Sequence, residues 1–159
     1  MTRWLDDDEQ RTWRAFLAVS ELLYGALDRQ LQRDAGITHA SYVVLAMLSE
    51  APDRSLRMSD LAARANASPS RLSHAVARLE ERGWVRRAPA ERDARGTVAT
   101  LTDAGWDVLV RTAPGHVAAV REHLFDRLTP EQVAALGGIC DAVLEGLDPD
   151  HERRRALPC

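Results

Sequence analysis

The sequence predicts a mainly α-helical protein with one small β-hairpin, in the arrangement of a winged helix-turn-helix between helices at each end of the chain. Two observations carry this prediction. A short apolar segment and a capped helix follow each other between residues 59 and 83, which is the signature of a helix-turn-helix. After Gly83 the apolar residues change from helical spacing to strand-like runs over 84–87 and 97–101, which is typical of a hairpin.

The N-terminal segment predicts two helices. Acidic residues crowd the start of the first, which spans about 8–33, and Gly36 lies just past its end. Both features favour a helix of these bounds, because acidic side chains suit a helix start and glycine suits the residue after its end. Thr38 then caps a second helix that runs through Leu48, and Pro52 closes it. We expect residues 1–36 to contribute to dimerisation and 37–101 to form the DNA-binding domain.

Within that domain, Ser59 is expected to cap a short helix that ends near Asn66, and Ser68 and Pro69 begin the next helix, which continues to residue 82. A serine hydroxyl accepts a hydrogen bond from an unpaired backbone N–H, and proline at the first helical position loses nothing by lacking one. The two strands that follow enclose a polar loop over 89–96, which we call the wing.

Residues 102–147 predict two more helices for dimerisation, followed by a flexible polar tail over 148–159. Thr102 caps the first, which Pro114 and Gly115 should kink or interrupt. Thr129, Pro130 and Gln132 predict the start of the last helix. Its apolar residues are spaced by three and four, as in a helix that packs along another helix, or within one subunit: Val133, Leu136, Cys140, Val143 and Leu147.

Basic residues gather in the middle of the chain, although the whole chain carries a net charge of −3. Residues 54–96 hold 10 arginines and 5 acidic residues, whereas 1–53 hold 5 and 9, and 97–159 hold 6 and 10. A duplex is a dense line of phosphate charge, so a local basic surface matters more than the total. The distribution therefore indicates double-stranded DNA as a partner.

The helix after Pro69 has the composition of a major-groove helix. Four apolar residues fall on one face, and small polar, imidazole and guanidinium groups fall on the other. Serine can bond base edges or phosphates, arginine can fork onto guanine, and N-terminal residues reach deepest. The alternative is an ordinary amphipathic helix with a solvated polar face. The candidate contacts are Ser68, Ser70, Arg71, Ser73, His74 and Arg78.

The wing carries the second set of candidates. Arg92 and Arg95 on a hairpin tip suit the narrow minor groove, where the negative potential attracts guanidinium groups. Asp93 would be repelled by phosphate, so we expect it to hold Arg95 or the loop in shape through a charge-assisted hydrogen bond. The alternative for this segment is a solvated charged turn.

In the order and spacing of these motifs the chain resembles the MarR family of bacterial transcriptional regulators, over roughly residues 8–147. The matching segments are 56–62, 68–73, 79–87, 92–96 and 101–105. The resemblance implies a triangular homodimer that grips a palindromic operator, with Arg95 as the minor-groove contact and Asp93 as its companion.

The resemblance also implies a pocket where the dimer layer meets the winged domain, often filled by small aromatic acids. Trp13, His39 and Tyr42 are candidates to line it, with core packing as the alternative for Trp13 and Tyr42. On the first helix, Phe16 and Leu17 add an apolar surface to the dimer layer. We expect the terminal helices of two chains to interleave there.

No catalytic, metal or cofactor motif is found in the sequence. His116 and His123 lie two helical turns apart, about 10 Å, too far to share one metal ion. Cys140 is expected to be a small core residue rather than a redox switch. We find no nucleophile paired with a base and no phosphate-binding glycine loop, so we expect neither an enzyme nor a cofactor.

The sequence also lacks membrane and export signals. No apolar run approaches the ~20 residues that cross a bilayer, and the acidic N-terminus is unlike a signal peptide. We therefore expect a cytoplasmic bacterial protein, associated with the nucleoid when bound to its operator.

The leading interpretation is a homodimeric, sequence-specific DNA-binding repressor, with a small molecule as the candidate for relieving repression. The alternative is a winged-helix module that binds another protein and shows no specific DNA binding.

Overall fold

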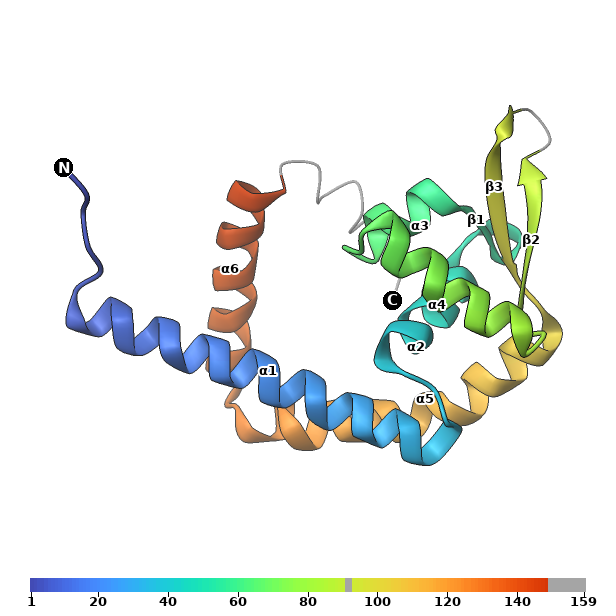
Figure 1. Cartoon of the computed structure of the whole chain (residues 1–159). Helices are drawn as coiled ribbons and strands as arrows, with labels where there is room; N and C mark the ends of the chain where they lie inside the picture. The colour runs from blue at the N-terminus through green and yellow to red at the C-terminus, as the bar shows by residue number, and fades with distance from the viewer. Residues whose placement is uncertain (91–92, 149–159) are drawn as a thin grey trace.

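The computed structural model describes residues 1–90 and 93–148, and of residues 93–95 it describes the backbone alone. The elements follow the predicted order (Figure 1): α1 (Asp7–Ala35), α2 (His39–Glu50), a 3₁₀ turn (Pro52–Arg54), β1 (Ser55–Arg57), α3 (Met58–Arg64), α4 (Pro69–Glu81), β2 (Val85–Ala90), β3 (Asp93–Leu101), α5 (Asp103–His123), a second 3₁₀ turn (Phe125–Arg127) and α6 (Pro130–Leu147).

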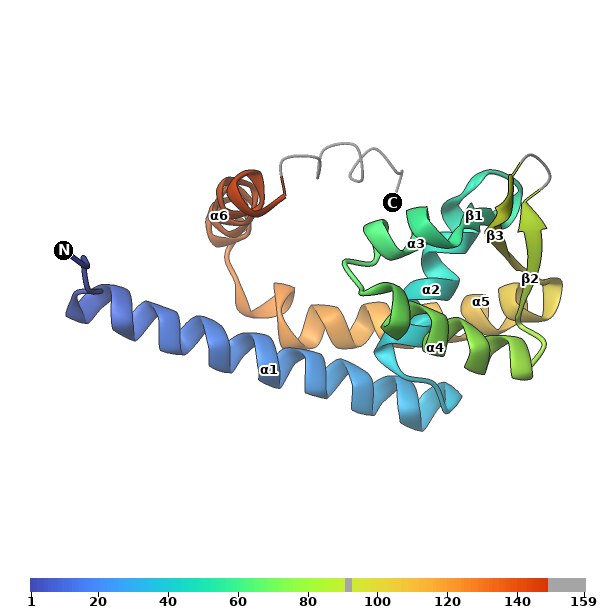
Figure 2. The same ribbon diagram turned by 45° about the horizontal axis from the view of Figure 1, so that its top comes forward.

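The terminal helices and the middle of the chain occupy different parts of the molecule. Helices α1 and α5 lie along each other and form a long base (Figure 1). The elements from α2 to β3, which we call the winged unit, sit at one end of this base, and α6 stands beyond the C-terminal end of α5 (Figure 2). A mainly helical winged helix-turn-helix with packed N- and C-terminal helices is confirmed.

Local caps explain most helix boundaries. Asp6 accepts a hydrogen bond from the Glu9 backbone at 2.8 Å, and the Glu9 carboxylate accepts the Asp6 N–H at 3.0 Å. At the other end of α1, Gly36 takes the left-handed conformation with φ of 63°. Thr38 caps α2 as predicted, by accepting the Ser41 N–H at 3.2 Å.

One predicted cap is wrong. Helix α3 begins at Met58 with Arg57 as the cap residue, and no side chain bonds the first turn. Ser59 lies inside the helix and donates to Asp60 at 3.3 Å. The chain enters α3 directly from β1, so the sheet fixes the start of the helix and no side-chain cap is required.

The sheet has three strands, one more than the predicted hairpin, in the order β1–β3–β2, with both pairings antiparallel. Strand β1 was missed because three residues are too short to show a period, although Leu56 is buried and pairs with Ala99. The hairpin strands are also longer than predicted. The pairing reaches Ala90 and Asp93 through a register shift after Pro89, so only the tip of the expected loop remains.

The core fills the space between α2, α3, α4, the sheet and the start of α5. The apolar face predicted for α4 is confirmed, because all four of its residues are buried: Leu72, Ala75, Val76 and Leu79. The largest buried side chains are Leu31, Val44, Leu45, Leu48, Leu61, Val76, Leu79 and Val85.

Helix α5 is not interrupted at Pro114 and Gly115, where the sequence predicted a kink or an interruption. It continues from residue 103 to 123. The helix packs closely on α1 next to the proline, since a Cβ on Gly115 would lie 3.1 Å from Asp34 Oδ2. Gly105 has a stricter role, because a Cβ there would lie 2.2 Å from the Trp84 carbonyl oxygen.

No residue of helix α6 is buried in the described part of the chain. Its start is as predicted, with Thr129 and Gln132 capping each other. The apolar stripe is not packed within the subunit, and Cys140 is exposed rather than part of the core. No helix among the described residues is long and apolar enough to span a membrane.

Candidate nucleic-acid interface

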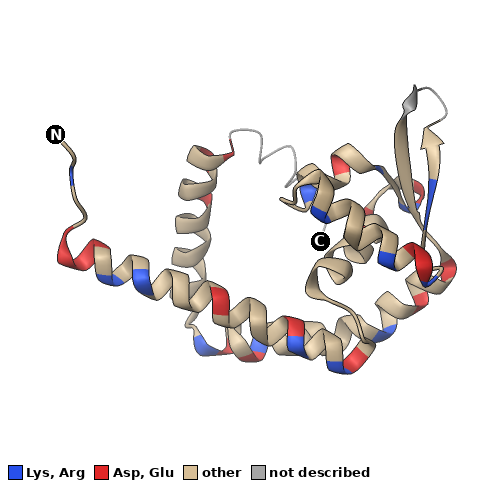
Figure 3. Cartoon of the chain, in the orientation of Figure 1, with Lys and Arg blue, Asp and Glu red and all other residues tan. Residues whose placement is uncertain are grey.

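The predicted recognition residues share one outward face of α4. Ser68, Ser70, Arg71, His74 and Arg78 are exposed and Ser73 is half-buried. The buried apolar face fixes this orientation, because α4 cannot rotate without exposing it. Ser68 also caps the helix, accepting the Arg71 N–H at 3.3 Å. The basic residues of α4 and β2 appear in blue in Figure 3.

The predicted wing loop is the tip of the β2–β3 hairpin, which projects beside α4 (Figure 1), and from here on the wing means this whole hairpin. Arg92 lies outside the described residues, and so do the side chains of Asp93 and Arg95. The backbone places residues 93 and 95 in β3, close to the tip. The expected bond between Asp93 and Arg95 therefore stays a prediction.

An ion pair that sequence reasoning missed joins the recognition helix to the wing. Glu80 Oε1 accepts the backbone N–H of Arg87 at 3.1 Å, while Oε2 accepts from Arg87 Nε at 2.9 Å and Nη2 at 2.6 Å. These side-chain hydrogen bonds hold the pKa of Glu80 below its ordinary value of 4.5. The only sequence signal is an acid near the end of a helix and a base in the next strand, which becomes meaningful once the turn at Gly83 brings them together.

Between α4 and the wing lies a cavity of about 460 Å³. It is lined by the end of β1, by the starts of α3 and α4, and by residues of β2 and β3. The cavity contains two arginines and several hydroxyl groups, and no carboxylate is among the described residues that line it: Arg57, Met58, Ser59, Pro69, Ser73, Arg87, Gly96 and Thr97. Of the predicted site residues whose side chains the structure describes, Ser73 alone belongs to it.

Further contacts fix the foot of the wing to the rest of the chain. Arg82 donates to the Gly36 carbonyl at 3.0 Å and lies over the Trp84 ring, 4.9 Å from its centroid. Thr102 donates to the Gly83 carbonyl at 2.8 Å. The turn between α4 and β2 is thus tied both to the end of α1 and to the start of α5.

A buried polar cluster lies where α1, α2 and α5 meet. The His116 ring is 4.2 Å from the Tyr42 ring and 5.6 Å from the His39 ring, between centroids. Gln30 donates to Asp34 at 2.7 Å, so its Oε1 is the acceptor for His116 Nδ1 at 3.2 Å. His116 Nδ1 therefore carries the hydrogen. Burial lowers the pKa of both histidines, and for His116 the neighbouring His39 lowers it further.

The structure brings together two of the three predicted pocket residues. His39 and Tyr42 meet through His116, and the next aromatic ring is Tyr24, 5.5 Å from His39 between centroids. Trp13 is exposed and stacks on Phe16, with 6.2 Å between the ring centroids. At 1.5 Å per residue, Trp13 lies about 16 Å along α1 from Tyr24. Within one chain, Trp13 does not line the same pocket.

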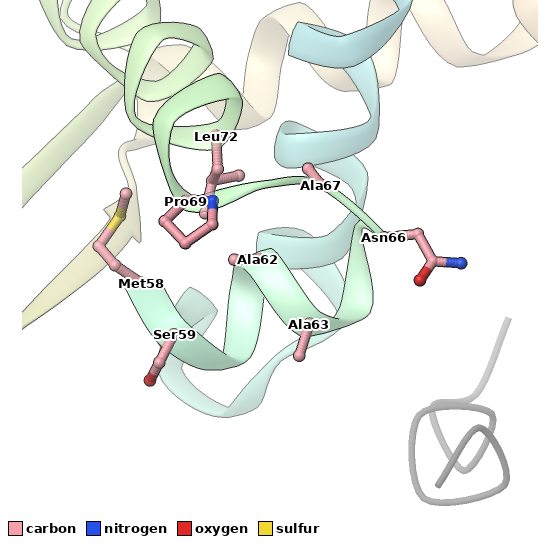
Figure 4. A pocket seen from close by; sticks show the side chains of 8 residues that line it. All are labelled: Met58, Ser59, Ala62, Ala63, Asn66, Ala67, Pro69 and Leu72. Carbon is pink, nitrogen blue, oxygen red and sulfur yellow. The ribbon is translucent and has the colours of Figure 1, made fainter. Parts of the chain in front are cut away.

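Two more cavities flank the helix-turn-helix. One of about 530 Å³ lies between α2 and the α3–α4 turn, and Tyr24, His39 and Arg71 are among its lining residues. The other, of about 600 Å³, lies between α3 and α4 and is drawn in Figure 4. Small side chains such as Ala62, Ala63 and Ala67 leave this space, and no charged residue of the described chain lines it.

None of the residues predicted to form the dimer layer is buried within the single chain. Phe16 and Leu17 are 61% and 46% exposed, and Val143 and Leu147 are 53% and 77% exposed. Val133 and Leu136 are half-buried. Within the described part of the chain, no three histidine, cysteine or acidic side chains are placed to hold a metal ion.

Comparisons with known proteins agree with this architecture. The family model of the MarR family matches residues 35–96. The HTH-type transcriptional repressor Rv2887 of Mycobacterium tuberculosis is 33% identical over 97 residues, which cover 61% of this chain and 68% of that protein.

Two solved structures from Streptomyces coelicolor are more similar. Sco3205, a MarR family transcriptional regulator in complex with DNA, is 56% identical, with a TM-score of 0.91, over 95% of this chain and 94% of that one. AbsC, also a MarR family transcriptional regulator, is 42% identical, with a TM-score of 0.81, over 97% of this chain and 99% of that one.

Proposed function

This chain belongs to the MarR family of transcriptional regulators, a family of regulators rather than enzymes, and from that premise we propose that it is a homodimeric repressor that binds a palindromic operator in double-stranded DNA. The observation that carries the proposal is the exposed polar face of α4, held outward by a fully buried apolar face. The similarity to Sco3205, solved with DNA, and to the repressor Rv2887 supports it.

We assign base reading to the N-terminal half of α4. Ser70, Arg71 and His74 are exposed and lie within its first two turns, where a recognition helix reaches deepest into the major groove. Ser68 and Ser73 flank these residues. Arg78 lies farther along α4, where it would contact the sugar–phosphate backbone of the DNA. Arg92 and Arg95 are proposed to enter the adjacent minor groove, with Asp93 shaping the hairpin tip.

We assign the exposed apolar residues of α1 and α6 to the contact between two copies. An apolar surface of this extent on a single chain marks an interaction site, and the three-and-four spacing on α6 suits a helix partner. A two-fold pair would present two recognition helices about 34 Å apart, one turn of DNA, and would require an inverted repeat. Such a regulator would act in the bacterial cytoplasm, at the nucleoid.

For a relieving ligand we propose the 530 Å³ cavity beside the α3–α4 turn. Tyr24 and His39 offer aromatic edges, and Arg71 offers a cation, so a small aromatic acid matches its lining. Because Arg71 also belongs to the recognition face, a carboxylate bound there would draw it away from DNA. Benzoate should then release a bound duplex, and His39→Ala should weaken this release without changing the affinity for the duplex alone. Benzoate without effect would remove aromatic acids as the ligand class.

The direct test of DNA binding is selection of bound fragments from random duplex. We expect an inverted repeat, and an affinity that falls by orders of magnitude between 50 and 200 mM salt. A protein-binding module would retain no duplex at any salt concentration. Sedimentation at micromolar concentration should show a dimer, and a species of 17.6 kDa would contradict the two-fold arrangement.

A further inference from the structure

We propose that the cavity between α4 and the wing is the seat of one backbone phosphate of the bound duplex. Arg57 and Arg87 would supply the positive charge, and Glu80 would position Arg87. The inference rests on the proposed DNA binding, and it adds a contact site that includes neither the wing tip nor the bases.

The geometry of B-form DNA leads to this cavity. A recognition helix in a major groove and a wing in the next minor groove are separated by one sugar–phosphate strand, because each strand is the wall between two grooves. That strand must cross the molecule between α4 and the β2–β3 hairpin. The 460 Å³ cavity lies at this crossing, since it is lined by the start of α4 on one side and by the hairpin on the other.

The lining matches a phosphodiester. Arg57 enters from the end of β1 and Arg87 from β2, so guanidinium groups come from two strands. Ser73 of α4 and Thr97 of β3 add hydroxyl donors. Arginine binds phosphate oxygens through paired charge-assisted hydrogen bonds. Ser59 also lines the cavity, but its hydroxyl already donates to Asp60.

Glu80 determines how Arg87 is presented. Its carboxylate holds both the backbone N–H and the Nε–Nη2 edge of the guanidinium. A guanidinium has a second donor edge, formed by Nη1 and Nη2, which can bind another acceptor. A carboxylate this close to DNA repels phosphate, so its presence is costly unless it orients the cation. Glu80 is therefore a positioning residue.

The decisive variant is Glu80→Gln, because two explanations of Glu80 predict opposite changes in the affinity for DNA. If Glu80 only adds negative charge near the duplex, its removal should tighten binding. If it aims Arg87, binding of the selected duplex should weaken by about tenfold, the value of one charge-assisted hydrogen bond. Glu81→Gln is the matched control, since it makes the same charge change at the next, exposed residue of α4 and should leave binding unchanged or slightly tighter.

The phosphate itself is tested by the salt dependence. Arg87→Gln and Arg57→Gln should each make the slope of log affinity against log salt shallower by about 0.9, the value for one lost phosphate contact. Arg86→Gln removes the same charge from the neighbouring residue of β2, which is exposed and points to the opposite face of the strand, and should change the slope less.

A duplex with single methylphosphonate substitutions identifies the partner of Arg87. One neutralised phosphate should weaken wild-type binding but leave the affinity of Arg87→Gln nearly unchanged, because the contact is already lost. If Glu80→Gln fails to fold in thermal unfolding, this duplex series with Arg57→Gln still decides the matter. An unchanged salt slope in Arg87→Gln, or tighter DNA binding by a folded Glu80→Gln, would overturn the proposed phosphate site. A wild-type protein that binds no duplex would instead overturn the proposed function.

Discussion

The winged unit and helix α6 differ in where they place their apolar side chains. In the winged unit, Leu45 and Leu79 are 0% and 1% exposed. On α6, Ile139 is 62% exposed, and Val143 and Leu147 of the apolar stripe are 53% and 77% exposed. Full burial of such a side chain stabilises a fold by about 1.5–3 kcal/mol. The winged unit obtains this stabilisation within one chain, and α6 can obtain it only from another surface.

The largest effect is expected inside the winged unit. Leu79→Ala empties a fully buried site, so the free energy of unfolding should fall by about 2–5 kcal/mol. Denaturant unfolding followed by circular dichroism measures the change, and Arg78→Ala on the exposed face of the same helix is the control. A cost below about 0.5 kcal/mol, as for a surface residue, would mean that this core is not closed.

The next effect sharpens the contrast from the α6 side. Val143→Asp should leave the single chain folded but weaken dimer formation by about 1–3 kcal/mol per subunit, because a polar group would be buried without a partner. Analytical ultracentrifugation over a dilution series measures the association. Glu145→Gln changes a charge on the same helix and should behave like the wild type. Association unaffected by Val143→Asp would exclude this face of α6 from the interface.

A smaller effect tests the place where the winged unit meets the base of α1 and α5, where the rings of His116 and His39 lie 5.6 Å apart between centroids. Their lowered pKa values mean that the unfolded chain binds protons more readily than the folded one below pH 6.5. Stability should therefore be complete above pH 6.5 and fall as the pH drops below it, by at most about 1.4 kcal/mol per pH unit for each histidine. Denaturant unfolding from pH 8 to pH 5 tests this, and His116→Gln should flatten the dependence.

The smallest effect compares two helix caps. Ser68→Ala removes the cap of α4 and should cost about 1 kcal/mol at any protein concentration. Thr129→Ala removes the cap of α6, and its cost should appear only at concentrations where the two copies associate. Thermal unfolding at two widely separated concentrations distinguishes the variants, and equal behaviour would mean that α6 folds without a partner surface.

The sequence predicted the features that depend on neighbours along the chain. Caps at Thr38, Ser68 and Thr129 act within three residues, so they could be read directly. The cap expected at Ser59 was wrong because the preceding strand, which has only three residues, fixes that helix start instead. The spacing of the α6 stripe was also read correctly, but the same spacing serves an inner or an outer face, and so Cys140 was wrongly expected in the core.

The side-chain contacts that were missed depend on how helices and strands fold onto one another. His39 and His116 are separated by a whole winged unit, and no local pattern pairs them. Glu80 and Arg87 meet across a turn, and Trp13 was grouped with His39 by residue type although a helix separates them. The DNA contacts of Ser70, Arg71, His74 and the wing arginines stay predictions until a duplex is bound.

The absence of a side chain at Gly105 has a mechanical consequence. It lets the first turn of α5 press against the Trp84 carbonyl, so a rod of 21 residues, about 31 Å long at 1.5 Å per residue, is seated at the foot of the wing. A tilt of about 10° in such a rod moves its end by roughly 5 Å, a sizeable fraction of the ~34 Å repeat of DNA. In the proposed homodimer, small adjustments along the base would therefore be amplified into changes in the distance between the two recognition helices.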